Sequence, residues 1–233
     1  MSVALLALSL AAVAQDAPSD DAEVELDLPE VYSFSHASGR LAALVFESTE
    51  TENSGRSHHH VVVARSWSGR LRWGEGTECA GEFKVSVAGL DADAPAERKA
   101  EDFGAPLAEL DRERVNTHMR ARDQLFADKF PELRYEVTRC RAGKDDHQVI
   151  IGNFSLRGIT QEVAFRVKAN EADGTLHLVG EGSITHSDFG FEPYYALYGQ
   201  RQNQDRMRLT IDVKGTAAGP DASLKAPLIE AGD

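Results

Sequence analysis

The sequence has only two cysteines, Cys79 and Cys140, and neither belongs to a CxxC, CxxCH or Cys–His–Cys pattern. Zinc, haem and dithiol redox sites built on those patterns are therefore not predicted. Each cysteine lies beside an expected strand, and two cysteines in an oxidising compartment can form one disulfide. The pattern leaves open whether these two pair.

A surplus of basic residues is also missing. The chain of 233 residues carries 25 Lys and Arg against 38 Asp and Glu, a formal net charge of −13. Nucleic-acid binding needs Lys and Arg to displace counterions from phosphates, so no nucleic-acid partner is expected. The same balance argues against adsorption on an anionic membrane through charge alone.

No apolar run is expected to span a membrane stably. The run Val3–Val13 is shorter than the roughly 20 residues that a bilayer requires. It ends in Ala12-Val13-Ala14, a small-x-small cleavage pattern typical of a secretory signal peptide. No Lys or Arg precedes the run, so the usual basic start is missing. We nevertheless expect a signal peptide over residues 1–14 and a periplasmic or secreted protein.

Composition divides the rest of the chain into three parts. Residues 15–30 are acidic and poor in large apolar side chains, as expected of a linker. Residues 215–233 are rich in Ala, Gly and Pro, which predicts a disordered tail. With 42% hydrophobic residues overall, residues 31–214 can form one domain with its own core.

Alternation of apolar and polar residues dominates that domain. Apolar side chains stand at every second position in three clear segments: Phe83, Val85 and Val87; Val163, Phe165 and Val167; Leu209, Ile211 and Val213. Six further strands are expected at Leu41–Glu47, His60–Arg65, Trp67–Trp73, Arg134–Arg139, Val149–Leu156 and Leu176–Thr185. Asp173-Gly174 is a strong hairpin signal. Strands in meander order favour an antiparallel β-barrel of about eight strands, with a β-sandwich left as the alternative.

One segment breaks the alternation. Apolar residues recur at helical spacing across Asp111–Lys129 and its flanks, at Leu110, Val115, Met119, Phe126 and Phe130. Pro131 is expected to end this segment, because proline cannot continue a helix. The predicted fold is thus all-β with one central helix.

Motifs of catalysis are absent. Gly180-Glu181-Gly182-Ser183 does not match a nucleophile elbow, and Gly74-Glu75-Gly76 lacks the third glycine of a dinucleotide site. Acidic pairs such as Asp91 and Asp93 lie in loop-like contexts, with no sign of the dry pocket that separates two pKa values. We expect no enzyme, no catalytic residue and no cofactor.

The histidines leave one alternative. His58-His59-His60 begins an expected strand, where His58 and His60 share a face. Together with His36 or His186, these two could bind zinc or copper, and the module with His186 could also hold haem. No spacing identifies a third ligand, so this metal- or haem-binding module ranks second.

Apolar side chains on the expected inward faces either fill the barrel or line a cavity for a lipid. The pattern alone favours a filled core over a lined cavity. If a cavity exists, we expect it to be lined by Phe83, Val85, Met119, Phe126, Phe130, Phe154, Leu156, Phe165, Leu178, Ile184, Phe189 and Tyr194.

Three segments resemble the YceI-like family. They are Val115–Phe130 followed by Pro131, then Val149–Phe165 with Gly152 and Leu156-Arg157-Gly158-Ile159-Thr160, and His186–Phe191 with Ser187-Asp188-Phe189-Gly190. The resemblance covers about residues 32–214. It implies a periplasmic lipocalin-like barrel that binds polyisoprenoids, without catalytic residues. Gly158, before Ile159-Thr160, suits a tight turn with positive φ.

The chain departs from the family pattern at a His-rich insertion, Asn53–His60, and at an aromatic loop with Tyr194, Tyr195 and Tyr198. Both departures put the choice of ligand in doubt. We therefore expect a protein that sequesters or carries an isoprenoid or quinone-like amphiphile. Its exact ligand and its oligomeric state, a homodimer included, are left open.

Overall fold

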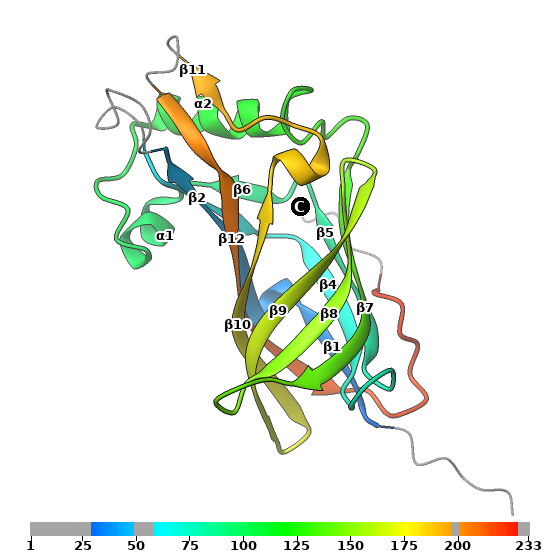
Figure 1. The fold of residues 1–233 in the computed structure, drawn as a ribbon. Helices are drawn as coiled ribbons and strands as arrows, with labels where there is room; N and C mark the ends of the chain where they lie inside the picture. Colours follow the sequence, from blue (N-terminus) through cyan, green and yellow to red (C-terminus); the bar gives the residue numbers. More distant parts are fainter. Residues whose placement is uncertain (1–28, 49–57, 197–200, 228–233) are drawn as a thin grey trace, which may run out of the picture.

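The computed structural model describes residues 29–48, 58–196 and 201–227. Within these ranges, twelve strands join in antiparallel pairs (Figure 1). The strands are β1 (Val31–Ser35), β2 (Gly39–Glu47), β3 (His60–Ala64), β4 (Trp67–Arg72), β5 (Ala80–Ser86), β6 (Leu90–Ala92), β7 (Glu132–Ala142), β8 (Gln148–Leu156), β9 (Ile159–Ala172), β10 (Thr175–Thr185), β11 (Tyr195–Ala196) and β12 (Arg201–Ala217). The helices are α1 (Pro95–Ala100) and α2 (Glu109–Arg120), with 3-10 turns η1 (His36–Ser38) and η3 (Ser187–Phe189).

Eight of these strands form a closed ring. The order runs β1–β4–β5–β7–β8–β9–β10–β12, and β12 then returns to β1 through the pairs Tyr32↔Ala217 and Ser33↔Thr216. Closure removes the free edges that an open sheet exposes. The prediction of an antiparallel barrel of about eight strands is confirmed, and the sandwich alternative is wrong.

The barrel wall branches at β12. Through residues 203–213 this long strand also pairs with β2, which pairs in turn with β3, and β3 with β6. A small second core lies on this branch, formed by Ala42, Leu44, Val61 and Val63 with Phe46 and Phe103 packed against it. Residue 103 belongs to the segment after α1, so that segment covers one face of the branch and leaves the other to the barrel interior.

Two tight hairpins have positive φ at both of their central residues. Asp173 and Gly174, between β9 and β10, have φ of 50° and 68°. Arg157 and Gly158, between β8 and β9, have φ of 54° and 77°. Positive φ at both central residues is typical of the type I′ turn, whose twist matches that of the flanking strands. The expected hairpin at Asp173-Gly174 and the expected positive φ of Gly158 are both confirmed.

The helical content differs from the prediction. The helix α2 ends at Arg120 instead of Lys129, and the backbone then turns back on itself, with the Leu125 amide donating to the Met119 carbonyl over 3.0 Å. Phe126 has φ of 50°, a value that a helix cannot contain. The helical spacing of Phe126 and Phe130 was therefore misleading, because the two side chains pack from a compact turn. The short helix α1 was not predicted.

The described end of the chain is packed on the barrel. β12 continues past the expected boundary at Lys214 to Ala217, and residues 218–227 then run along the outside of β4 and β5. The Ala226 amide donates to a Glu82 carboxylate oxygen over 2.8 Å, and the Ser68 hydroxyl donates to the Pro227 carbonyl over 2.8 Å. The tail was expected to be disordered from residue 215. It is instead held through residue 227, because its backbone forms hydrogen bonds with the side chains of Ser68 and Glu82.

Cys79 and Cys140 form a disulfide, which links the start of β5 to β7. The expected signal peptide, most of the expected linker, residues 49–57 and Tyr198 lie outside the described residues. Among the helices in the described ranges, none combines the length and the apolar character needed to cross a bilayer.

Candidate ligand-binding cavity

One end of the barrel interior is solid. The Phe34 ring lies so close to β12 that a Cβ on Gly215 would come within 2.5 Å of it. A Cβ on Gly69 would likewise lie 2.1 Å from the ring of Phe83, which packs against Phe34 and also borders the cavity described next. Large aromatic rings thus occupy the space that the two glycines leave free. The side chains that fill this end are at most 2% exposed: Tyr32, Phe34, Leu71 and Leu176.

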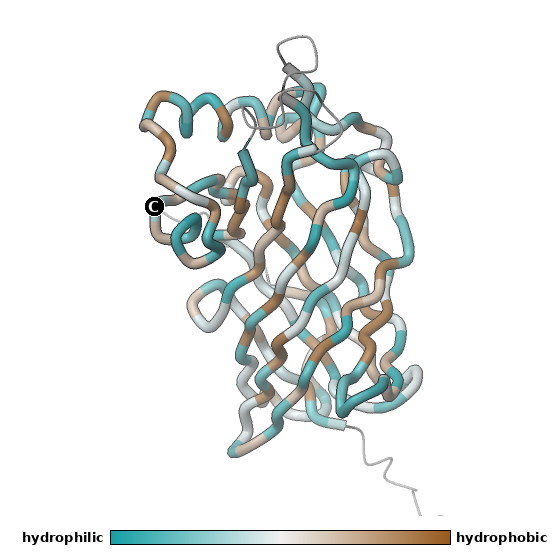
Figure 2. Tube along the Cα trace, turned by 60° about the vertical axis from the view of Figure 1, so that its left-hand side comes forward, coloured by the Kyte–Doolittle hydropathy of each residue, from teal (hydrophilic) through white to brown (hydrophobic). Residues whose placement is uncertain are grey.

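The other end, beneath α2, is hollow. A cavity of about 220 Å³ lies there, bounded by side chains from β2, β3, β5, β7, β8, β9, β10 and β12. Brown and teal alternate along these strands in Figure 2, as expected where one side chain in two faces an apolar interior. Eight of the expected lining residues bound this cavity: Phe83, Val85, Met119, Phe154, Leu156, Phe165, Leu178 and Ile184.

Four expected lining residues lie elsewhere. Phe126 and Phe130 pack edge to face on each other, with ring centroids 5.9 Å apart, in the turn after α2. Phe189 is 1% exposed and packs behind Phe154, 5.7 Å away between centroids. Tyr194 faces a second cavity. Because α2 ends early, the first two side chains are not directed into the barrel as a longer helix would have placed them.

Sequence reasoning missed the wall that β2 and β3 contribute. Leu41, Ala43 and Val45 from β2 line the cavity, with Val62 and Ala64 from β3. The alternation at 41, 43 and 45 was the available signal. The hollow forms where side chains are small, as at Ala43 and Ala64. Leu125, from the turn after α2, also lines the cavity.

His186 is a polar exception in this apolar wall. It is 4% exposed, and its Nδ1 donates to the Asp205 carbonyl oxygen over 2.7 Å. Its ring packs edge on against Phe191, 5.0 Å between centroids. Burial lowers the pKa of the His186 imidazole below its usual value, although Asp205 partly offsets this. The ring is therefore neutral at pH 7, and it adds no charge to the cavity.

Helix α2 lies across the hollow end (Figure 1). Polar side chains attach it to β6. None of its residues is buried. Asn116 accepts a hydrogen bond from the Ala92 amide over 2.9 Å and donates to the Ala92 carbonyl over 3.1 Å. Arg112, one helical turn earlier, donates to the same carbonyl and pairs with Asp91. These side chains satisfy the backbone hydrogen-bonding groups of Ala92 at the edge of β6. Helix α2 therefore covers the barrel without a large apolar contact.

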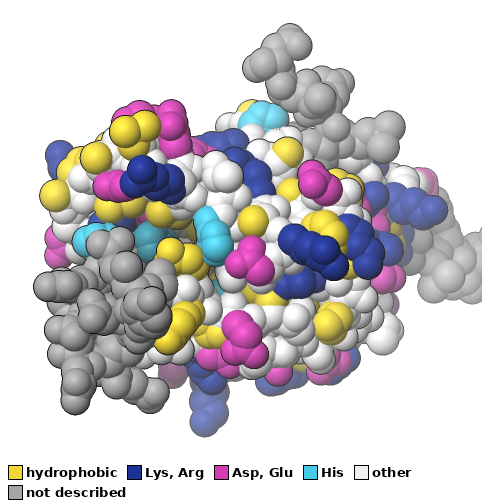
Figure 3. Space-filling model, turned by 90° about the horizontal axis from the view of Figure 1, so that it is seen from above, with side chains coloured by type: hydrophobic (Ala, Val, Ile, Leu, Met, Phe, Trp, Pro, Cys, Tyr) yellow, Lys and Arg dark blue, Asp and Glu magenta, His cyan; other side chains and the backbone are white. Residues whose placement is uncertain are grey.

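A second, more polar cavity lies against α2. Its volume is about 750 Å³, and it shares the wall residues Met119 and Gln124 with the apolar cavity. The polar part of its lining consists of His58, His60, His118, Asp111, Glu113, Arg114, Thr117, Gln124, Tyr194 and Asn203. Figure 3, which views the barrel from above this end, shows histidine side chains among apolar and acidic ones. The two cavities are thus neighbours of opposite character.

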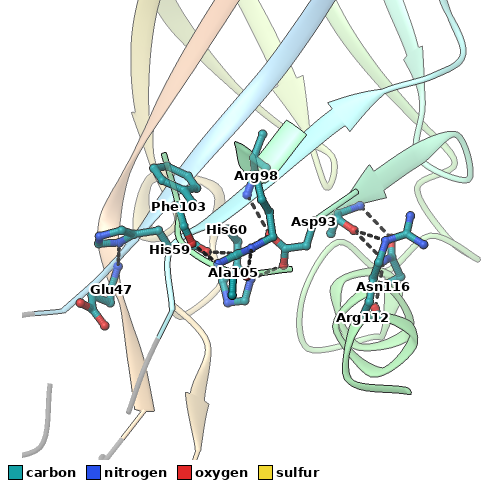
Figure 4. Close-up of polar contacts among 11 residues, drawn as sticks. Glu47, His59, His60, Asp93, Arg98, Phe103, Ala105, Arg112 and Asn116 are labelled. Carbon is teal, nitrogen blue, oxygen red and sulfur yellow. Dashed lines mark hydrogen bonds and ion pairs between the residues drawn. The ribbon is translucent and has the colours of Figure 1, made fainter. Parts of the chain in front are cut away.

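A buried ion-pair network supports one wall of the polar cavity (Figure 4). Asp93 is 0% exposed and Arg98 is 2% exposed, and the Arg98 guanidinium donates to the carboxylate over 2.9 Å. His60 Nδ1 lies 2.6 Å from the other carboxylate oxygen. Burial raises the pKa of the Asp93 carboxyl, but hydrogen bonds from His60, Arg98 and the Val61 amide outweigh burial and hold that pKa below its usual range. The Asp93–Arg98 ion pair is therefore fixed in place.

The three histidines of the metal alternative are not brought together. His58 and His60 line the polar cavity, whereas His186 lines the apolar one. No group of three His, Cys, Asp or Glu side chains within the described ranges is placed to hold a metal ion.

A closed antiparallel barrel, solid at one end and hollow and apolar at the other, defines a lipocalin-like fold. The model of the YceI-like domain matches residues 34–215, so the chain belongs to that family. The crystal structure of BcnA from Burkholderia cenocepacia is similar, with a TM-score of 0.58 and 12% identity over 78% of this chain and 99% of that chain. A mutant of the Campylobacter jejuni YceI protein has a TM-score of 0.50 and 13% identity over 66% of this chain and 83% of that chain. No curated protein matches the sequence.

Proposed function

We propose that this protein is an exported carrier that holds the hydrocarbon tail of an isoprenoid-like amphiphile in the hollow end of its barrel. The observation that carries the proposal is the apolar cavity of about 220 Å³. An engineered apolar cavity of roughly 150 Å³ stays dry and binds benzene. A larger cavity with an apolar wall has the same preference for hydrocarbon over water.

Burial of the tail supplies the affinity. Each methylene group removed from water contributes about 0.8 kcal/mol, so ten such groups contribute about 8 kcal/mol before the costs of association. No charged contact is required for this binding. Branched isoprenoid tails suit a wall that alternates large side chains, such as Phe154 and Phe165, with small ones, such as Ala43 and Ala64.

The carrier is proposed to release its ligand chemically unchanged. Export is supported by the apolar run Val3–Val13 with its cleavage pattern and by the disulfide between Cys79 and Cys140. In an aqueous compartment, an amphiphile with a long tail needs a protein to shield it from water. Sequestration and transport both follow from the same shielding.

Native mass spectrometry of protein purified from its host tests the proposal. We expect bound lipid that organic solvent releases, and we expect the delipidated protein to take up added geranylgeraniol in a one-to-one complex. The released and the added lipid should be recovered with unaltered masses. Protein that is empty after purification and that takes up no prenol would refute the proposal.

A further inference from the structure

The polar cavity beside the apolar one is lined by a histidine whose ring is held in place by a buried carboxylate. His60, at the start of β3, has a side chain that is 16% exposed, and it lines this cavity. Its Nδ1 is engaged by Asp93 over 2.6 Å. The opposite ring nitrogen, Nε2, is therefore the one that a molecule in the cavity can reach.

The support behind His60 cannot move easily. The Asp93 carboxylate also accepts hydrogen bonds from the Val61 amide over 3.2 Å and from Arg98 over 2.9 Å. Arg98 in turn donates to the His59 carbonyl over 2.7 Å and to two carbonyls of the segment after α1. Breaking such a buried pair by removing one partner is costly, so the carboxylate holds one orientation. A carboxylate fixed in this way orients the imidazole and selects its tautomer.

The charge of the cavity restricts what it can accept. Arg114 is the one Lys or Arg among the described residues that line it, and its side chain is 79% exposed and paired with Asp111 over 3.2 Å. Asp111 and Glu113 add negative charge to the same wall. A phosphate entering here would lose water without meeting a buried cation, which is strongly unfavourable. An uncharged head group avoids that cost.

We propose that the polar cavity holds the head group of the ligand, that this group is an uncharged hydroxyl, and that His60 Nε2 accepts its hydrogen bond. This inference rests on the proposed function, since it places the tail in the apolar cavity. Met119 and Gln124, which border both cavities, then lie beside the point where tail meets head group. The tautomer that donates Nδ1–H to Asp93 presents Nε2 to the cavity as an acceptor, which a hydroxyl complements and a phosphate dianion does not.

The test compares three ligands on delipidated protein: geranylgeraniol, geranylgeranyl phosphate and the corresponding hydrocarbon without a head group. Dissociation constants are measured for the unaltered protein, His60→Phe and His60→Gln. His60→Phe should weaken prenol binding about tenfold, the cost of one lost hydrogen bond. It should leave hydrocarbon binding unchanged. His60→Gln retains an acceptor and should recover part of the loss.

The control is His177→Phe. His177 also forms a His–Asp pair, with Asp212 over 2.7 Å, but it lies on the outer face of β10 and lines neither cavity. It should change binding of none of the three ligands, and thermal unfolding should confirm that both Phe variants are folded.

Five outcomes decide between these possibilities. The inference is supported if the unaltered protein prefers prenol to phosphate and hydrocarbon and His60→Phe removes the preference for prenol over hydrocarbon. It is overturned if prenol and hydrocarbon bind equally to the unaltered protein, or if His60→Phe weakens hydrocarbon binding as much as prenol binding. If geranylgeranyl phosphate binds as tightly as geranylgeraniol, the inference that the head group is uncharged is wrong. If no ligand binds at all, the proposed function itself fails.

Discussion

The two ends of one barrel share their long strands and the same alternation, yet only one end has room for a ligand. At the solid end, the ring of Phe34 occupies the space above Gly215. At the hollow end, the branch of the wall formed by β2 and β3 presents the small side chains of Ala43 and Ala64 to the cavity. Whether a barrel is filled thus depends on how large and small side chains are matched across it.

The packed side chains of the solid end stabilise the fold. An empty cavity loses contacts with every atom that lines it, so a barrel hollow throughout would lose much of its packing energy. Here Tyr32, Leu71 and Leu176 form a compact core at one end, and the disulfide joins the strands nearby. That core supports the fold, while the cavity end contributes less to stability and is free to bind.

The largest expected effect is the loss of stability when a leucine is replaced by alanine, which should differ between the two ends. Leu71→Ala, in the solid end at 0% exposure, should lower the free energy of unfolding by about 4 kcal/mol. Leu209→Ala, in the cavity wall, should cost about 2 kcal/mol, because one side of Leu209 already faces empty space. Urea unfolding of both variants provides the measurement. Equal losses would mean that the two ends are packed alike.

A second prediction concerns a substitution that fills the apolar cavity. Ala43→Phe, whose ring would project into the cavity, should reduce geranylgeraniol binding more than tenfold while changing the free energy of unfolding by less than about 1 kcal/mol. Ala164→Phe adds the same ring at an exposed position of β9 and should leave binding unaltered. Binding titrations and urea unfolding test both variants. A large loss of stability with binding retained would show that position 43 faces packed atoms.

The smallest expected effect concerns the pH dependence of stability. Burial lowers the pKa of His186, the largest contribution to its shift, so the folded protein binds a proton there less readily than the unfolded chain does. The unfolded state therefore gains protons first as the pH falls through about 6.5, and stability declines below that pH.

The variant His186→Gln should reduce that decline between pH 7 and pH 5, as measured by urea unfolding at each pH. His177→Gln, on the outer face, serves as the control and should leave the pH profile as it is in the unaltered protein. An unchanged profile in His186→Gln would show that some other group controls acid sensitivity.

Much of the fold could be predicted from local patterns. The alternation of Val163, Phe165 and Val167 predicts a strand and its inward face, because side chains in strands point to alternate sides. Asp173-Gly174 predicts a hairpin, because its two residues tolerate positive φ. Both of these signals are local, and both lead to confirmed elements.

The candidate site could be predicted only in part. Eight of the expected lining residues bound the cavity, but Phe126 and Phe130 do not, because the length of α2 depends on how the following turn packs. The pairing of His60 with Asp93 joins residues 33 positions apart. No periodicity brings these two together; only the docking of β6 on β3 does.

The sequence by itself determined the strands, their inward faces and the turns that link them, since each depends on neighbours along the chain. The tertiary structure alone decided that one end is filled, that the other is hollow, and that a polar cavity adjoins it. The physical reason is that cavity volume depends on side chains from many strands meeting in space, and no local pattern records which large residue faces which small one.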